Sequence, residues 1–195
     1  EAAEESDVVV PVGWEFYEIS DVAKEYPDTK FIWVDNPAEG IEDLPNVLCI
    51  LYAQNEGSFL AGYIAASMSE TGVVGAVGGE DNDTINDFLI GYKEGAQYAN
   101  PDIKVVTNYA NTYEDPAKGK ECALALNSQG ADVVFAVAGN TGNGVFAAAK
   151  EKGFYVIGVD QDQKLSAPEY DEQIICSMKK GIGTIVYETM KALIE

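Results

Sequence analysis

The sequence contains no histidine and no arginine, and these two absences remove common tools of catalysis and of anion binding. Histidine is the usual general base near neutral pH and the commonest metal ligand. Arginine supplies the planar, bidentate clamp that holds phosphate and carboxylate groups. An uncharged small ligand therefore suits this chain better than a nucleotide or a sugar phosphate, and we expect no metal, no cofactor and no catalytic residue.

Basic side chains are scarce in general. The 195 residues include 12 basic side chains, all of them lysine, against 33 acidic ones, which gives a formal net charge of -21. Such a surface repels nucleic acid and anionic membranes, so we expect no nucleic-acid partner. For most of these carboxylates, a contribution to solubility explains their presence equally well.

Cysteine is also rare, and long apolar runs are absent. Cys49, Cys122 and Cys176 are isolated, odd in number and without CxxC spacing, so small buried hydrophobic residues are favoured over disulfides or a zinc site. No run of about 18 apolar residues suggests a membrane span. No signal peptide is visible, but the first five residues resemble the tail of a helix cut in mid-element, so they do not indicate a compartment.

What the chain does have is a nearly regular alternation of strand and helix patterns. The expected strands are Val8 to Val12, Phe31 to Asp35, Val47 to Tyr52, Val73 to Val77, Lys104 to Tyr109, Val133 to Ala138, Tyr155 to Val159 and Ile174 to Met178. The expected helices are Phe16 to Tyr26, Gly57 to Ser69, Thr84 to Ala99, Pro116 to Gln129, Thr141 to Lys152 and Gly181 to Ile194. This alternation predicts an α/β fold of parallel sheets flanked by helices.

The most informative segment is Gly130 to Gln163, which reads as strand, glycine-rich loop, helix and strand. Its loop, with Gly139 and Asn143, and the carboxylate of Asp160 fall at the strand ends where open α/β sheets bind ligands. Free N–H groups at the helix start can hold an oxygen, and a carboxylate can accept two sugar hydroxyls. The glycine spacing is not GxGxxG, and a tight connection without a ligand remains the alternative.

Several phrases of the chain closely resemble the basic membrane protein family, the PnrA-like group of ABC-transporter substrate-binding lipoproteins. They are VGAVGG, DFLIGYKEGAQYANPDIKV, DPAKGKE, GADVVFAVAGNTG, IGVDQDQ and YAQNEGSFLAGYIAA, in the family's order along the whole chain. The resemblance implies a two-lobed type I periplasmic-binding-protein fold that binds a purine nucleoside between its lobes. It also implies an extracytoplasmic lipoprotein, anchored by a lipid absent from this chain, that delivers its ligand to an ABC permease.

The resemblance also divides the chain. Residues 1–71 are expected to form the second half of a first lobe, residues 72–178 the second lobe, and residues 179–195 a helix that returns toward the first lobe. A two-lobed receptor needs more than this length, since single domains run at about 100 to 150 residues. We therefore expect a fragment truncated at both ends, with an incomplete first lobe that lacks the family's Asp-x-x-Phe-Asn segment.

Three side chains gain a role from the resemblance. The family places an aromatic residue at Tyr113 that stacks on the purine, although an ordinary loop tyrosine fits equally well. It carries a lysine after Ser-Met-x, which selects Lys180 as a donor to a ribose hydroxyl or a purine acceptor. Asp160 would accept both ribose hydroxyls.

Two weaker candidates complete the site. Asp81 lies in a polar loop that leaves room for base recognition, although the following helix favours carboxylates at its start and capping alone explains Asp83 equally well. The family often has methionine where Glu80 stands, so we expect this loop to alter the preferred base. The acidic residues of this loop could also suggest Ca²⁺, but the full EF-hand pattern is missing. Trp14 follows the first strand and could border the cleft, although core packing explains it as well.

Two function classes remain open at this point. One is a solute receptor that closes two lobes on a nucleoside without chemistry. The other is an α/β enzyme that acts on a nucleoside or sugar, with Asp160 or Asp162 as acid or nucleophile. A sensor with a receptor-like fold is a weaker third. The absence of a converging second catalytic group favours the receptor.

Overall fold

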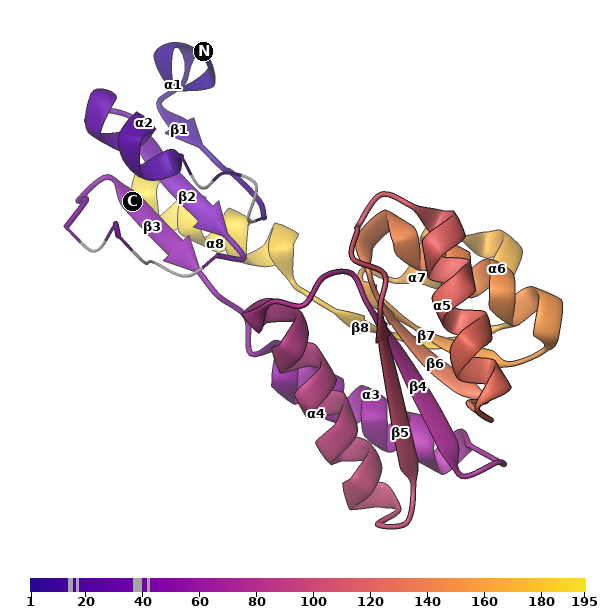
Figure 1. Cartoon of the computed structure of the whole chain (residues 1–195). Coiled ribbons are helices and arrows are strands. Elements are labelled where there is room, and N and C mark those ends of the chain that lie inside the picture. Colours follow the sequence, from indigo (N-terminus) through magenta and orange to yellow (C-terminus); the bar gives the residue numbers. More distant parts are fainter. Residues whose placement is uncertain (14–15, 17, 37–39, 42) are drawn as a thin grey trace. The chain divides into compact units, whose positions relative to one another are not determined.

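Parallel strands and helices alternate along the computed structural model (Figure 1), which confirms the predicted α/β class. The structure describes residues 1–13, 16, 18–36, 40–41 and 43–195. The strands are β1 Val8–Val9, β2 Lys30–Val34, β3 Val47–Ile50, β4 Val73–Gly78, β5 Lys104–Tyr109, β6 Val133–Val137, β7 Tyr155–Asp160 and β8 Ile174–Lys179. The helices are α1 Ala2–Glu5, α2 Ile19–Glu25, α3 Gln54–Met68, α4 Asp83–Ala99, α5 Pro116–Ser128, η2 Gly139–Thr141, α6 Gly142–Lys152, α7 Gln163–Ser166, η3 Pro168–Tyr170 and α8 Ile182–Ile194.

The chain separates into two units by its internal contacts. Unit 1 contains Glu1–Tyr52 and Gly181–Glu195, and unit 2 contains Ala53–Lys180. The sequence-based boundary after residue 71 differs from this division, because α3 packs along α4 and therefore belongs to unit 2. Within the described residues, no helix is both long enough and apolar enough to cross a membrane.

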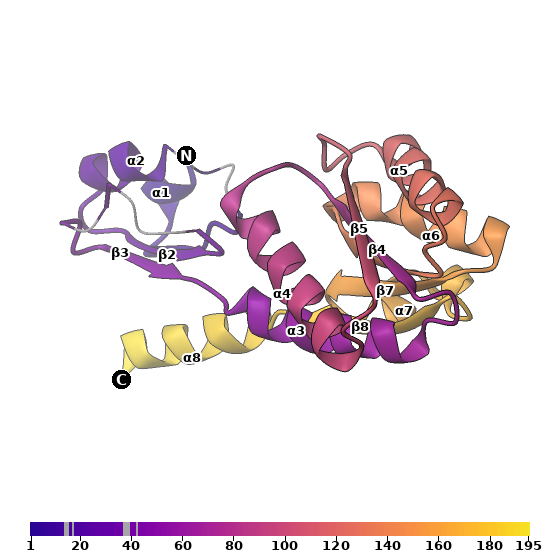
Figure 2. The same cartoon turned by 60° about the horizontal axis from the view of Figure 1, so that its bottom comes forward.

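Unit 2 is built on a parallel five-stranded sheet in the order β5-β4-β6-β7-β8. Helices α3 and α4 cover one face, and α5 and α6 cover the other (Figure 2). The central strand β6 is buried along its whole length: Phe135 packs toward α3 and α4, whereas Val134 and Ala136 pack toward α5 and α6. A strand covered on both faces must be apolar at every position, which explains its continuous apolar sequence.

Unit 1 contains a smaller parallel sheet in the order β1-β2-β3. Phe31 and Trp33 of β2 pack with Ile19 and Ala23 of α2 to form its core. The buried amide of Asn46 donates to three backbone carbonyls and so ties the segment before β3 to the end of α2 and the turn that follows it. The polar group is satisfied by the chain itself, as buried polar groups must be.

Helices α3 and α4 approach each other closely because glycines lie at their contact. A Cβ atom on Gly62 would stand 1.9 Å from the carbonyl oxygen of Tyr92, and one on Gly95 would stand 1.9 Å from that of Phe59. Gly91 meets the backbone of Asn55 in the same way. No other residue leaves room for this contact, so the glycines determine how α3 is placed on unit 2.

We predict that Gly62→Ala destabilises unit 2. The added methyl group forces the two backbones apart, and overpacking of this kind costs about 1 to 3 kcal/mol. Gly142→Ala is the matched control, since its Cβ would have its nearest neighbours at 3.7 Å and its backbone is already helical. The control should stabilise by about 0.5 to 1 kcal/mol through helix propensity. Urea unfolding of the two variants measures both effects, and equal stability of the pair would contradict the packing argument.

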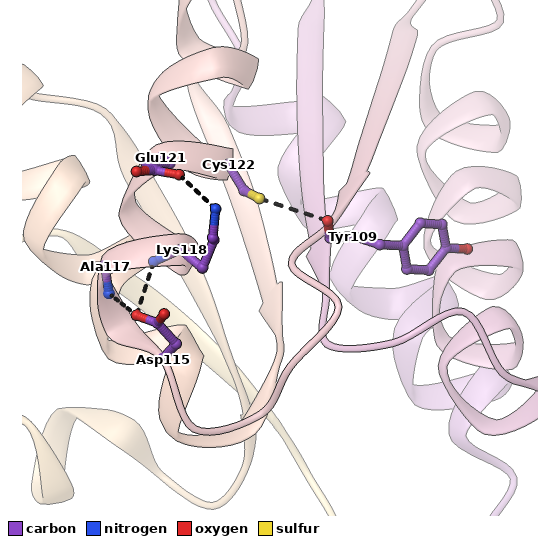
Figure 3. A network of polar contacts seen from close by, with 6 residues as sticks. All are labelled: Tyr109, Asp115, Ala117, Lys118, Glu121 and Cys122. Atoms are coloured by element: carbon purple, nitrogen blue, oxygen red, sulfur yellow. Dashed lines mark hydrogen bonds and ion pairs between the residues drawn. The ribbon is translucent and has the colours of Figure 1, made fainter.

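The cysteines are half-buried, and Cys122 sits in a polar contact network at the start of α5 (Figure 3). The carboxylate of Asp115 caps α5 by accepting two N–H groups of its first turn, at 2.9 and 3.2 Å. Lys118 pairs with Glu121 at 3.3 Å, and the Cys122 thiol faces the carbonyl oxygen of Tyr109 with a sulfur–oxygen distance of 3.8 Å. Burial raises the pKa of Cys122, Glu121 raises it further and Lys118 lowers it.

Burial is also the main cause of the raised pKa of Cys49 and of Cys176. The thiolate is the reactive form, so a raised pKa slows alkylation. We predict that iodoacetamide modifies the native protein more slowly than the urea-unfolded protein at pH 8. Because burial raises the folded-state pKa values, the protonated thiols favour the folded state over the unfolded state. This contribution to stability is complete below the ordinary thiol pKa of 9.0 and is lost as the pH rises through the folded values. Mass spectrometry that finds one thiol equally reactive in both states would contradict the prediction for that residue.

Candidate functional site

The candidate site lies at the carboxyl edge of the unit 2 sheet. Because all five strands are parallel, their carboxyl ends lie along one edge, and the loops that follow them come together there. Asp81 follows β4, Tyr113 follows β5, Gly139 follows β6, Asp160 ends β7 and Lys180 follows β8. The sheet topology thus brings five of the predicted residues to the same edge.

Asp160 and Lys180 are adjacent at the ends of β7 and β8. The backbone N–H of Lys180 donates to the carbonyl oxygen of Asp160 at 2.9 Å. Asp160 has a φ of 65°, in the left-handed region that aspartate and asparagine tolerate better than most residues. Backbone strain of this kind costs about 1 to 3 kcal/mol and is concentrated at binding sites. The Asp160 residue is exposed, so this conformation presents it at the sheet edge.

Lys180 is the only charged residue that is buried in the described part of the chain, with 7% of its surface exposed. Its Nζ lies 4.7 Å from the ring centroid of Phe88, which is itself buried on α4. A cation over an aromatic face gains roughly 2 kcal/mol or more when it is desolvated, which helps to hold the lysine in place. The sequence analysis expected a cation here but did not identify its aromatic partner.

Tyr113 is held between two loops of the sheet edge. A Cβ on Gly79 would stand 2.1 Å from its ring, so this glycine allows the tyrosine to approach, whereas a Cβ on Gly139 would make only an ordinary contact, 3.4 Å from the Cβ of Tyr113. Its hydroxyl accepts a hydrogen bond from the amide of Asn82 at 2.9 Å. The side chain is half-buried. These contacts give the ring a fixed position, which an ordinary mobile loop tyrosine would not have.

Gly139 begins η2 with a φ of 52°, in the left-handed region that favours glycine. The next buried residue, Thr141, joins the loops because its hydroxyl donates to the carbonyl of Thr112 at 3.1 Å and accepts the N–H of Asp115 at 2.9 Å. Sequence reasoning missed Thr141 as a positioning residue, because its partners Thr112 and Asp115 follow β5 whereas Thr141 follows β6. Asn143 is exposed on the first turn of α6 and donates to the side chain of Asn140 at 2.7 Å.

Asp81 is exposed and accepts a hydrogen bond from the amide of Asn86 at 2.9 Å. The hydroxyl of Tyr109 donates to the other end of this amide at 2.5 Å. Burial raises the pKa of Tyr109, and the charge of Asp81 raises it further, so the phenol stays protonated and continues to donate. The helix cap of α4 is Asn82, whose side chain accepts the N–H of Ile85, whereas Asp83 is the first residue of the helix.

The remaining sequence-based candidates have different outcomes. Trp14 lies outside the described residues. Asp162, which the enzyme alternative invoked, caps α7 by accepting the N–H of Lys164 at 3.2 Å. Among the residues that the structure describes, no three histidine, cysteine, aspartate or glutamate side chains are grouped so that they could hold a metal ion.

Sequence reasoning also missed Gln54, at the start of α3. It is 4% exposed, and its amide nitrogen donates to Asp87 of α4 at 3.1 Å. Its amide oxygen has no hydrogen-bond partner within the described part of the protein, although a buried polar atom normally has one. In the sequence, Gln54 is only a polar residue at the start of a helix, and helix capping would explain such a residue.

Comparison with known proteins agrees with this geometry. The family model for the PnrA-like ABC-transporter substrate-binding proteins matches residues 2–195. Basic membrane protein D of Borreliella burgdorferi (strain JD1) is 37% identical over 185 residues, which cover 92% of this chain and 53% of that protein. Basic membrane protein A of Borreliella burgdorferi (strain ATCC 35210 / DSM 4680 / CIP 102532 / B31) is 37% identical over 182 residues, 91% of this chain and 52% of that protein.

A solved structure supports the same assignment. An ABC transporter system solute-binding protein from Aeropyrum pernix K1 superposes with a TM-score of 0.87 at 32% identity, over 99% of this chain and 56% of that one. The chain therefore spans about half the length of the relatives that it matches, as a part of the fold with an incomplete lobe would. On these matches, the chain belongs to the PnrA-like family of ABC-transporter substrate-binding proteins, a family of binding proteins and not of enzymes.

Proposed function

We propose that this chain is part of an extracytoplasmic receptor that binds a purine nucleoside at the carboxyl edge of unit 2 and delivers it to an ABC permease. The observation that carries the proposal is the junction of Asp160 and Lys180, where an exposed aspartate with a left-handed backbone is joined by a backbone hydrogen bond to a buried lysine. A carboxylate accepts hydrogen bonds only, and an ammonium group donates only. Together they match the vicinal hydroxyls of a ribose, which both donate and accept.

The base would bind against Tyr113. Its ring lies against Gly79, its hydroxyl accepts from the Asn82 amide, and the residue is half-buried. A fixed aromatic face stacks on a purine at little entropic cost. Asp81 and the loop amides are then the candidates to distinguish one base from another. Gly139 and Asn143 would hold a ligand oxygen at the start of α6.

Two features of composition support an uncharged ligand. The chain has no arginine to clamp a phosphate, and its net charge of -21 repels anions. A nucleoside carries no phosphate, so it suits both features. The wider assembly follows the family: the lobes would close around the ligand, and a lipid anchor outside this chain would keep the protein at the membrane surface.

The direct test is a thermal-shift screen of nucleosides, free bases, nucleotides and sugars. It should use both this chain and a longer polypeptide that contains it and spans the full length of its relatives. A ligand that binds only the folded state raises the melting temperature by mass action. At a ligand concentration of a hundred times the Kd, the free energy of unfolding increases by about 2.7 kcal/mol. We expect guanosine, inosine or adenosine to raise the melting temperature of the longer protein. A shift from sugars alone would overturn the nucleoside assignment.

Asp160→Asn tests the ribose contact. The change keeps the shape of the side chain but replaces a charged acceptor, and hydrogen bonds to charged groups are worth about 1.5 to 3 kcal/mol. Nucleoside affinity should therefore fall by about ten- to a hundredfold, measured by calorimetry. The control ligand is the 2′,3′-dideoxynucleoside, which has no vicinal hydroxyls and should lose almost nothing. An equal loss for both ligands would mean that Asp160 supports the loop and not the sugar.

A further inference from the structure

The turn that ends β7 holds Asp160 in an unusual conformation. The N–H of Gln161 donates to the carbonyl oxygen of Val159 at 2.7 Å, so Asp160 is the central residue of a three-residue turn. Its φ of 65° identifies the rare and strained form of such a turn. A strained turn persists only where the surrounding structure holds it in place. The contacts on either side of Asp160 therefore decide how this residue is presented at the sheet edge.

The sheet itself holds one side of the turn. Strand β7 pairs with β8 as far as Asp160 and Lys179, and the N–H of Lys180 donates to the carbonyl oxygen of Asp160 at 2.9 Å. The pairing of β7 with β6, by contrast, ends at Ile157. The backbone of Val159, which comes directly before the turn, therefore finds its partners outside β6.

The side chain of Gln163 supplies the missing partner. Its Oε1 atom accepts the N–H of Val159 at 2.7 Å, at the short end of the range for backbone N–H donors. The backbone N–H of Gln163 donates to the hydroxyl oxygen of Ser177 on β8 at 3.1 Å. Gln163 thus joins the residue before Asp160 to the neighbouring strand and closes the turn on its second side.

Gly158 leaves room for this arrangement. A Cβ atom at this position would stand 2.6 Å from the hydroxyl oxygen of Ser177, 2.7 Å from Oε1 of Gln163 and 3.0 Å from the Cβ of Gln163. Contacts this short would force both side chains to move. The glycine therefore allows the glutamine to fold back over the end of β7.

Helix capping does not account for Gln163, although it is the first residue of α7. Asp162 is the cap of this helix and accepts the N–H of Lys164. The Oε1 atom of Gln163 accepts from the strand before the helix instead. The remaining alternative to a role at the site is that Gln163 only satisfies a buried backbone N–H, as buried polar groups require.

We propose that Gln163 is a positioning residue, which holds Asp160 in its strained turn so that the carboxylate meets the vicinal hydroxyls of the ribose. The inference rests on the proposed function, because the ribose contact of Asp160 belongs to it. Gln163 acts through the backbone of Val159, and Ser177 and Gly158 keep the glutamine in place.

Hydrogen exchange of the 195-residue chain, followed at single amides by NMR, tests the positioning without a ligand. Gln163→Met keeps an unbranched side chain but replaces the carbonyl oxygen by a weak acceptor, whereas Gln163→Glu keeps an acceptor oxygen. In Gln163→Met, exchange at Val159 and Lys180 should accelerate about fivefold, as the loss of one hydrogen bond predicts, and exchange in β4 should not change. Gln163→Glu should keep both amides protected. Unchanged exchange at Lys180 in Gln163→Met would overturn the proposal, because Asp160 would then hold its place without Gln163.

Calorimetry of the longer polypeptide that spans the full length of the relatives tests the effect on the ligand. Gln163→Met should weaken ribonucleoside binding by about three- to tenfold, and Gln163→Glu should bind as the wild type does. Affinity for the 2′,3′-dideoxynucleoside should stay the same in all three proteins. An equal loss for both ligands would overturn the proposal, since a purely structural residue would weaken both. If the wild type binds no nucleoside, the proposed function fails, and the exchange rates still decide whether Gln163 fixes Asp160.

Discussion

The parallel pairing of β4 to β8 is the constraint on which the rest of unit 2 depends, because a parallel strand must return to the same end of the sheet before the next one begins. Each return passes through a helix that covers a face of the sheet. The strands are thereby buried on both faces, and every carboxyl end lies at one edge. Residues far apart in the sequence, such as Asp81, Tyr113 and Asp160, reach that edge because of this topology and not because of local sequence.

To cover one face of the sheet, α3 and α4 must lie close together, and their glycines make this close contact possible. The helices can lie backbone against backbone at Gly62, Gly91 and Gly95 because no side chain intervenes. Close contact places the small residues inside and turns the large apolar residues of α3 outward. The same packing that completes the core therefore leaves large apolar side chains of α3 exposed.

At the site itself, charge and backbone strain are concentrated in two residues. Lys180 is buried against Phe88 and is the one buried charged residue among those that the structure describes. Asp160 adopts a left-handed backbone at the end of a buried strand. Because strained backbone is concentrated at binding sites, the proposed ligand contact is based on these two residues.

The sequence by itself determined the α/β class, the order of most strands and helices, the family and the strand-end positions of the candidate residues. These follow from apolar runs, glycines and capping residues, which act over a few neighbours. The assignment of α3 to unit 2, the cation–π contact of Lys180 with Phe88, and the role of Gly79 beneath Tyr113 were decided only by the tertiary structure. Each depends on contacts between elements that are separated in the sequence, and a single sequence does not record which elements meet.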